Sequence, residues 1–314
     1  LFYELLTLIT FPLVSHKGSK DALRGARVYL SILLGTSVGL QLLGIIWIYY
    51  NVGTLDFIAG GILGDYFSYT ELIILVGLFA FGIGKAALFP FHRWLPAAMV
   101  APTPVSALLH AVAVVKAGVF TVLKVGIYIF GVEKLAISET TDWLVWIACF
   151  SILFASLIAM TKDNLKARLA YSTISQLAYV VLGFALANSL GILGGTLQII
   201  THAFGKITLF MCAGSIYVAT KKTNISDMRG LGRVMPITFL SFLIGAISII
   251  GLPPLGGSWS KWYLILASLE AEKQFVVIVL LISSLLNIGY LLPLVARGFF
   301  LKPDTETENK RFSE

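Results

Sequence analysis

Apolar residues along the chain gather in blocks of about 20, and short polar stretches separate the blocks. A block of this length is what a helix needs to cross the hydrocarbon core of a bilayer. The blocks predict about nine helices, at 1–14, 28–50, 71–91, 104–131, 142–161, 168–187, 190–219, 236–271 and 274–300. The predicted fold class is therefore all-α: a polytopic bundle of transmembrane helices over residues 1–300, followed by a polar C-terminal tail over 301–314.

Composition excludes a water-soluble protein. Of the 314 residues, 58% are hydrophobic and 12% are charged, whereas a soluble domain carries roughly 25% charged residues. Cys149 and Cys212 each lie inside an apolar block, and the chain has no CxxC or Cys/His cluster. We therefore expect no disulfide, no bound metal and no cofactor held by this chain. The first block, Leu1 to Val14, contains Glu4 and lacks a basic leader, so we interpret it as a span whose preceding sequence is absent.

Loop charges predict the topology. When the loops are assigned alternately to the two sides, one side receives most of the basic residues: Lys17, Lys20, Arg24, Arg27, Arg93, Lys162, Lys166, Arg168, Lys221, Lys222, Arg229, Arg233, Lys302, Lys310 and Arg311. The other side receives Lys134 and Lys273, with Asp56, Asp65, Glu133, Glu139 and Asp142. Basic loops face the cytoplasm or its organellar equivalent. The net charge of +7 thus reflects topology, and we expect no nucleic-acid partner.

Proline and glycine interrupt two of the predicted spans, each beside a lysine. The residues at these breaks are Pro90 and Pro96, after Lys85, and Pro253, Pro254, Gly256 and Gly257, before Lys261. Proline removes a backbone donor and clashes with the preceding turn, so both helices should break. Paired broken helices are typical of transporters built from repeats. Proline kinks are also common in membrane helices, so the breaks alone do not decide between these interpretations.

Ionisable residues occur within the predicted spans, where a charge costs roughly 2.5 to 3.5 kcal/mol. They are Glu4, Lys85, His110, Lys116, His202, Lys206 and Lys261, with Lys124 and Lys166 nearer to span ends. Gln198, His202 and Lys206 recur every four residues and share one helix face. Desolvation makes a lysine exchange its proton more readily, and histidine titrates near neutral pH. Ser172, Thr173, Ser175 and Gln176 can hold water between such groups.

Two structural alternatives remain for these residues. Each group taken singly can be a packing residue with a polar neighbour, and Lys124 and Lys166 can extend to the interface.

Enzymatic motifs are absent: Gly84 and Lys85 resemble the end of a phosphate loop, but Phe79 and Ala86 break that pattern. The set as a whole therefore indicates movement of protons or cations.

The motifs GKAALFPFHRWLPAAMVAPTPVSALLHAVAVVKAGVF, DNLKARLAYSTISQLAYVVLG, THAFGKITLF and GLPPLGGSWSK resemble a known family. It comprises the antiporter-like membrane subunits of NADH-quinone oxidoreductase (respiratory complex I), multisubunit cation/proton antiporters and membrane-bound hydrogenases. The resemblance extends from Glu4 to about Phe300. It implies a fold of about 14 helices with two inverted five-helix repeats, of which this chain holds most of the first and all of the second.

The resemblance also implies roles for residues in proton translocation. Glu4 and Lys85 match the family's paired glutamate and lysine. His110, Lys166, His202 and Lys206 match its connecting groups, and Lys261 matches its exit-side lysine. Two positions depart from the pattern: Gln198 stands where some members have histidine, and Lys116 replaces a neutral residue of some complex I members, which favours antiporter or hydrogenase relatives.

The sequence therefore predicts a proton-translocating, antiporter-like subunit of a redox-driven complex of the NADH-quinone oxidoreductase or hydrogenase type. It has no active site of its own but belongs to a translocase. Expected partners are other membrane subunits, the lipid bilayer, protons and, as an option, Na+; the expected location is the prokaryotic plasma membrane. A subunit of a multisubunit Na+/H+ antiporter is the alternative within the family. A carrier of an organic substrate and a structural scaffold are the alternatives outside it.

Overall fold

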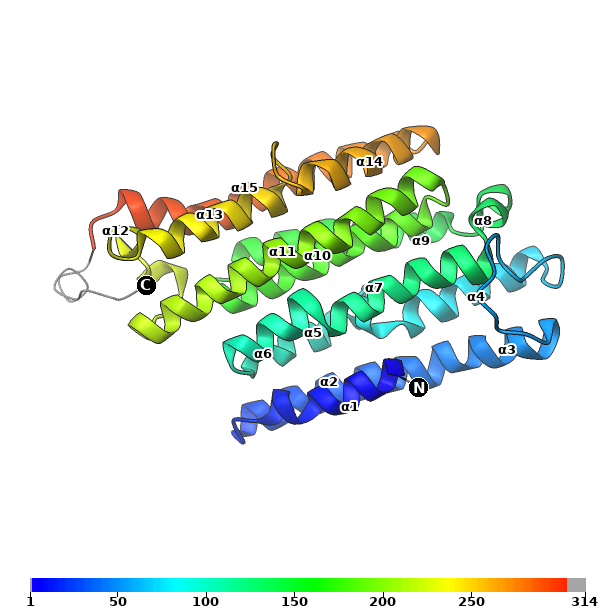
Figure 1. Cartoon of the computed structure of the whole chain (residues 1–314), viewed down its shortest axis with the longest axis horizontal. Coiled ribbons are helices and arrows are strands. Elements are labelled where there is room, and N and C mark those ends of the chain that lie inside the picture. The colour runs from blue at the N-terminus through cyan, green and yellow to red at the C-terminus, as the bar shows by residue number, and fades with distance from the viewer. Residues whose placement is uncertain (1, 304–314) are drawn as a thin grey trace.

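The computed structural model describes residues 2–303, which form helices stacked in successive layers (Figure 1). The first layer contains α1 (Phe2–Ser15) and a continuous helical segment of α2 (Lys20–Thr36), η1 (Ser37–Gln41) and α3 (Leu42–Val52). The next contains α4 (Tyr69–Gly82), η2 (Gly84–Ala86), η3 (Phe91–Arg93), α5 (Trp94–Ala97), η4 (Ala98–Val100), α6 (Thr103–Ala107), η5 (Leu108–Val112), α7 (Val114–Val125) and η6 (Gly126–Phe130). Then follow α9 (Asp142–Thr161), α10 (Leu165–Ala185) and α11 (Ser189–Thr220), and finally α13 (Pro236–Ile250), α14 (Gly257–Glu270) and α15 (Gln274–Phe300).

The predicted spans are confirmed by this arrangement. Within the described residues, five helical segments are long and apolar enough to cross a membrane: Lys20–Val52, Thr103–Phe130, Asp142–Thr161, Ser189–Thr220 and Gln274–Phe300. Phe2–Ser15, Tyr69–Gly82 and Pro236–Ile250 are shorter apolar helices. α11 packs against α10 on one side and against α13 and α14 on the other, so it lies inside the bundle.

Both predicted breaks are present, but the first begins earlier than expected. α4 ends at Gly82, whereas the sequence pattern predicted a helix to residue 91. A proline at position 90 clashes with the carbonyl of residue 86, so the helix cannot continue through this region. The chain instead runs through short helical turns to Val100, and the indole of Trp94 donates a hydrogen bond to the Gly84 carbonyl at 2.9 Å. Lys85 consequently lies in the short 3-10 turn η2 and not in a continuous α-helix.

The second break separates α13 from α14, as predicted. α13 ends at Ile250, and residues 251–256 form a connection without helical structure. Gly257 begins α14, and a Cβ atom there would lie 1.8 Å from the Ser248 carbonyl oxygen. Only glycine allows the two half-helices to approach so closely.

Two π-helical segments interrupt the fourth span, which the sequence pattern predicted as a regular helix. η5 and η6 are each a single π-helical turn, which is wider than an α-helical turn because its hydrogen bonds join residues five apart in the chain. His110 lies within η5. Hydrophobic spacing did not reveal either segment, because both keep the span apolar.

The two ends of the bundle carry different loops. α12 (Leu231–Val234) lies at one end and α8 (Val132–Ser138) at the opposite end (Figure 1). At the α8 end, Lys134 forms an ion pair with Asp65 at 3.2 Å, and Lys273 forms one with Asp142 at 2.7 Å. The two lysines on the predicted acidic side are therefore both paired with acids of that side. Of the predicted polar tail, residues 304–314 lie outside the described residues.

Candidate functional site

Buried ionisable side chains cross the bundle from the first layer to the last, roughly perpendicular to the helices. Lys85, His110, His202 and Lys206 are at most 1% exposed, while Lys116 and Lys261 are 9% and 6% exposed. They lie on η2, η5, α7, α11 and α14, and the half-buried Glu4 lies on α1, so each layer contributes at least one ionisable group (Figure 1). Charges at such depth are costly unless they meet polar partners.

Glu4 and Lys85 form the first contact in this row. The Glu4 Oε1 atom lies 3.2 Å from the Lys85 Nζ atom, and the Glu4 side chain keeps 25% exposure. Lys85 Nζ also lies 3.2 Å from the centroid of the Tyr3 ring, in a cation–π contact. The break after Gly82 turns the lysine toward α1, so one ammonium has a carboxylate and an aromatic face as partners. Sequence reasoning paired Glu4 with Lys85 but missed Tyr3.

The next group joins α7 to α11. Lys116 Nζ lies 2.6 Å from His202 Nδ1, and the other ring nitrogen of His202 is buried without a hydrogen-bond partner among residues 2–303. Neither ring nitrogen of His110 has a hydrogen-bond partner in this described part of the chain, and its ring packs 5.3 Å from that of Phe210. Histidines held in this way have free lone pairs or hydrogens inside the bundle. They are therefore available to water or to a transferred proton.

Lys206 lies one turn along α11 from His202 and is fully buried. Its ammonium donates to Ser172 Oγ at 2.7 Å and to the Leu169 carbonyl at 3.3 Å. It therefore faces α10 inside the bundle and not the lipid. His110 lies within electrostatic range of both Lys206 and Lys166.

Gln198 bridges α10 and α14 at the position where histidine was the alternative. Its amide donates to Gln176 Oε1 at 2.7 Å, and its oxygen accepts a hydrogen bond from Ser260. All three side chains are buried. Ser260 directly precedes Lys261 in the chain, and the Gln176 amide nitrogen has no hydrogen-bond partner among the described residues.

Lys261 occupies the break between α13 and α14. Its ammonium donates to the Ile250 carbonyl at 2.7 Å, which is an unpaired helix-end acceptor, and to Ser284 Oγ at 2.9 Å. The break thus supplies the backbone acceptor that a buried ammonium needs. The sequence located this lysine beside the break but did not identify its partner on α15.

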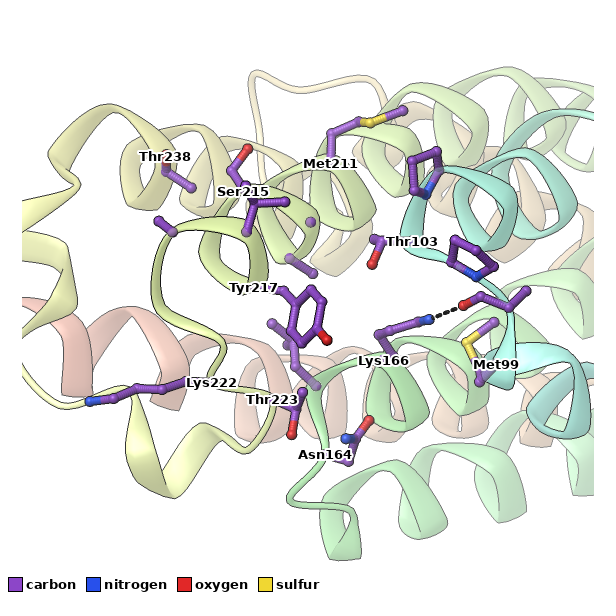
Figure 2. Close-up of a pocket in the computed structure, with 18 of the residues that line it drawn as sticks. Met99, Thr103, Asn164, Lys166, Met211, Ser215, Tyr217, Lys222, Thr223 and Thr238 are labelled. Atoms are coloured by element: carbon purple, nitrogen blue, oxygen red, sulfur yellow. Dashed lines mark hydrogen bonds between the residues drawn. The ribbon is translucent and has the colours of Figure 1, made fainter. Parts of the chain in front are cut away.

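A cavity of about 950 Å³ opens beside Lys166, at the end of the bundle with the basic loops. Figure 2 shows Lys166 extending from α10 toward the carbonyl oxygen of Ala101, which it reaches at 2.6 Å. Met99 and Tyr217 flank it, while Lys222 points away from the cavity. Lys166 is half-buried at the wall of this cavity. The sequence alone did not decide whether it extends to the membrane interface or belongs to the proton path.

Polar residues on α15 were missed by the sequence reasoning. Ser283, Ser284, Asn287 and Tyr290 lie on one face of this otherwise apolar helix and turn toward α9, α10 and α14. Their spacing of three to four residues is the signal that could have revealed them. Serine and tyrosine are common in membrane helices, so residue type alone does not distinguish this polar face from polar residues scattered along a span.

Comparison with known proteins agrees with this geometry. A family model described as "NADH:quinone oxidoreductase/Mrp antiporter, TM" matches residues 1–287. NADH-quinone oxidoreductase subunit N of Desulforudis audaxviator is 34% identical over 302 residues, covering 95% of this chain and 59% of that protein. NAD(P)H-quinone oxidoreductase chain 5 of Synechocystis sp. is 35% identical over 284 residues, covering 83% of this chain and 40% of that protein.

Two solved structures share the fold. A chain of the membrane-bound sulfane sulfur reductase, an archaeal respiratory membrane complex, superposes with a TM-score of 0.86 and 28% identity, covering 100% of this chain and 63% of that chain. A chain of the Mrp complex from Dietzia sp. gives 0.84 and 25% identity, covering 97% and 56%. The chain therefore spans less than two thirds of each of these four relatives.

Proposed function

Because the chain belongs to the NADH:quinone oxidoreductase/Mrp antiporter transmembrane family, as its motifs predicted, we propose that it is a proton-translocating, antiporter-like subunit of a redox-driven membrane complex. It is an integral membrane protein with several spanning helices. The proposal includes other membrane subunits as partners and a prokaryotic plasma membrane as the location, which the relative from Desulforudis audaxviator supports. The chain contributes the proton path, and the electron chemistry belongs to other subunits.

The observation that carries this proposal is the row of buried lysines and histidines across successive helix layers. Lysine and histidine exchange protons, and each lysine in this row, like His202, lies next to a group that can accept or donate one. Glu4 and Lys85 form the first pair, Lys116 and His202 the second, and Lys206 and Lys261 continue the row through serine hydroxyls. In this proposal, water enters from the basic side through the cavity beside Lys166.

An organic-substrate carrier and a scaffold fit these observations less well. The 950 Å³ cavity adjoins the end of the first break at Met99 and Val100. It is lined by neither of the break lysines, Lys85 and Lys261, at which a carrier of this type needs its ligand site. A scaffold needs no row of buried bases. Two of these bases, His110 and His202, have ring nitrogens without a hydrogen-bond partner among the described residues. A Na+/H+ antiporter subunit remains the second candidate, because the Mrp complex shares the fold with a TM-score of 0.84.

Two lysines of the same helix provide a matched test. Lys116 contacts His202, whereas Lys124 lies over the Phe57 ring at 4.0 Å. We expect Lys116→Gln to reduce proton transport at least tenfold in the complete complex reconstituted in vesicles, and Lys124→Gln to leave it within twofold. Equal transport by both variants would contradict the relay. Flux that requires Na+ on the opposite side would favour the antiporter candidate.

A further inference from the structure

A sequence of buried hydrogen bonds leads away from Lys206 to α15. Lys206 Nζ lies 2.7 Å from Ser172 Oγ, and Ser172 Oγ lies 2.9 Å from the Tyr290 hydroxyl. That hydroxyl in turn forms a hydrogen bond with Asn287 Oδ1. All four side chains are at most 1% exposed. Three helices, α11, α10 and α15, therefore contribute to one connected chain of polar groups.

The chemistry of its two ends fixes the direction of this chain. An ammonium can only donate, and an amide oxygen can only accept. The Tyr290 hydroxyl can donate to either Ser172 Oγ or Asn287 Oδ1, but it has a single hydrogen. Because Asn287 Oδ1 has no hydrogen to give, we assign the Tyr290 hydrogen to that oxygen, which leaves Ser172 as the donor to Tyr290. Every hydroxyl consequently turns its oxygen, the negative end of its dipole, toward Lys206. Hydrogen bonds aligned in this way strengthen one another in a medium of low dielectric constant.

The other groups near Lys206 act in the opposite direction. Lys116 on α7 and His110 on η5 lie near it, with His202 on its own helix, and Lys166 on α10 lies near His110. Each is cationic when protonated and so opposes a positive charge on Lys206. α13 carries no ionisable side chain, and Lys261 on α14 is again a base. The polarised hydroxyls thus favour the ammonium, together with the Leu169 carbonyl at 3.3 Å.

We infer that Tyr290 and Asn287 are positioning residues that stabilise Lys206 in its ammonium form through Ser172. They touch no transported proton themselves. Asn287 anchors the Tyr290 hydrogen, and this orientation leaves a lone pair of Ser172 directed at Lys206. The two residues thereby set the pH at which Lys206 releases its proton to the rest of the row, and this assignment rests on the function proposed above.

Conservative variants test the inference in the complete complex reconstituted in vesicles. Tyr290→Phe removes the hydroxyl and keeps the ring, and Asn287→Leu removes the amide at similar volume. Each should move the alkaline limb of the pH profile of proton transport to lower pH by about 0.5–1 unit, the size expected of one indirect hydrogen bond. The double variant should move it no further, because both residues act through one chain. Should Tyr290→Phe fail to assemble, Asn287→Leu alone decides.

Ser268→Ala is the matched control. Ser268 is buried on α14, and its hydroxyl bonds only to the Leu264 carbonyl of its own helix within the described residues. Its profile should stay in place. An unmoved profile in both single variants, or additive shifts in the double variant, would overturn the inference. Lys206→Gln separates the two hypotheses: wild-type transport by that variant would overturn the proposed function, whereas its failure alongside an unmoved Tyr290→Phe profile would overturn only the role of α15.

Discussion

Replacing Glu4 by glutamine should weaken the hold of Lys85 on its proton. The two charged atoms lie 3.2 Å apart, and at an effective dielectric constant of about 20 unit charges at this distance attract by about 5 kcal/mol. Glutamine keeps an oxygen that accepts a hydrogen bond from the ammonium, which retains about 1.5–3 kcal/mol. Water reaching the 25% exposed Glu4 side chain reduces the difference further. A net loss of about 2 kcal/mol is therefore expected.

This loss sets the size and the sign of the effect on transport. A difference of about 2 kcal/mol corresponds to about 1.5 pH units in proton release. The carboxylate favours the ammonium, so its removal makes Lys85 lose its proton at lower pH. The alkaline limb of the pH profile should move down by more than one unit. Assembly should persist, because the Tyr3 ring continues to contact the ammonium.

The assay is proton transport by the complete complex in vesicles, measured from about pH 5 to pH 10 so that both lysine and carboxylate titrations are covered. Glu133→Gln, which changes an exposed carboxylate on α8, is the control and should leave the profile in place. Size-exclusion chromatography checks that both variants assemble. An unchanged profile and rate for Glu4→Gln would refute the reasoning, because the carboxylate would then have no influence on Lys85.

Two further predictions concern the break lysine and a close helix contact. Lys261→Arg keeps the charge beside the Ile250 carbonyl but cannot release a proton, so it should assemble and transport no better than Lys261→Ala; full transport by the arginine variant would make Lys261 an electrostatic anchor. Gly118→Ala should lower the free energy of unfolding by about 1–3 kcal/mol, since its Cβ would lie 2.4 Å from the Lys85 carbonyl carbon. Gly77→Ala, whose nearest contact would be at 3.9 Å, is its control, and equal thermal unfolding temperatures for the two would contradict this packing argument.

Hydrophobic blocks were sufficient to predict the helices, because the bilayer imposes one length on each span. The bounds of α9 are those predicted, and α11 extends one residue further at each end. Buried charge in those spans likewise led to Lys85, Lys206 and Lys261. Partners were harder to predict, because they depend on which helices meet. The contacts of Tyr3 with Lys85 and of Ser284 with Lys261 join residues far apart in the chain.

The π-helical segment η5 gives the fourth span a fixed register between its two halves. A π turn accommodates one residue more than a regular turn, and each residue of an α-helix accounts for about 100° of rotation. If Leu108–Val112 became a regular α-helix with every residue retained, the extra residue would rotate Lys116 by that angle relative to the residues before η5. The 2.6 Å contact with His202 would then be lost without any change to either side chain. Natural variants of this span should therefore tolerate substitutions at lipid-facing positions such as Phe120, but not a further inserted residue between the two bases.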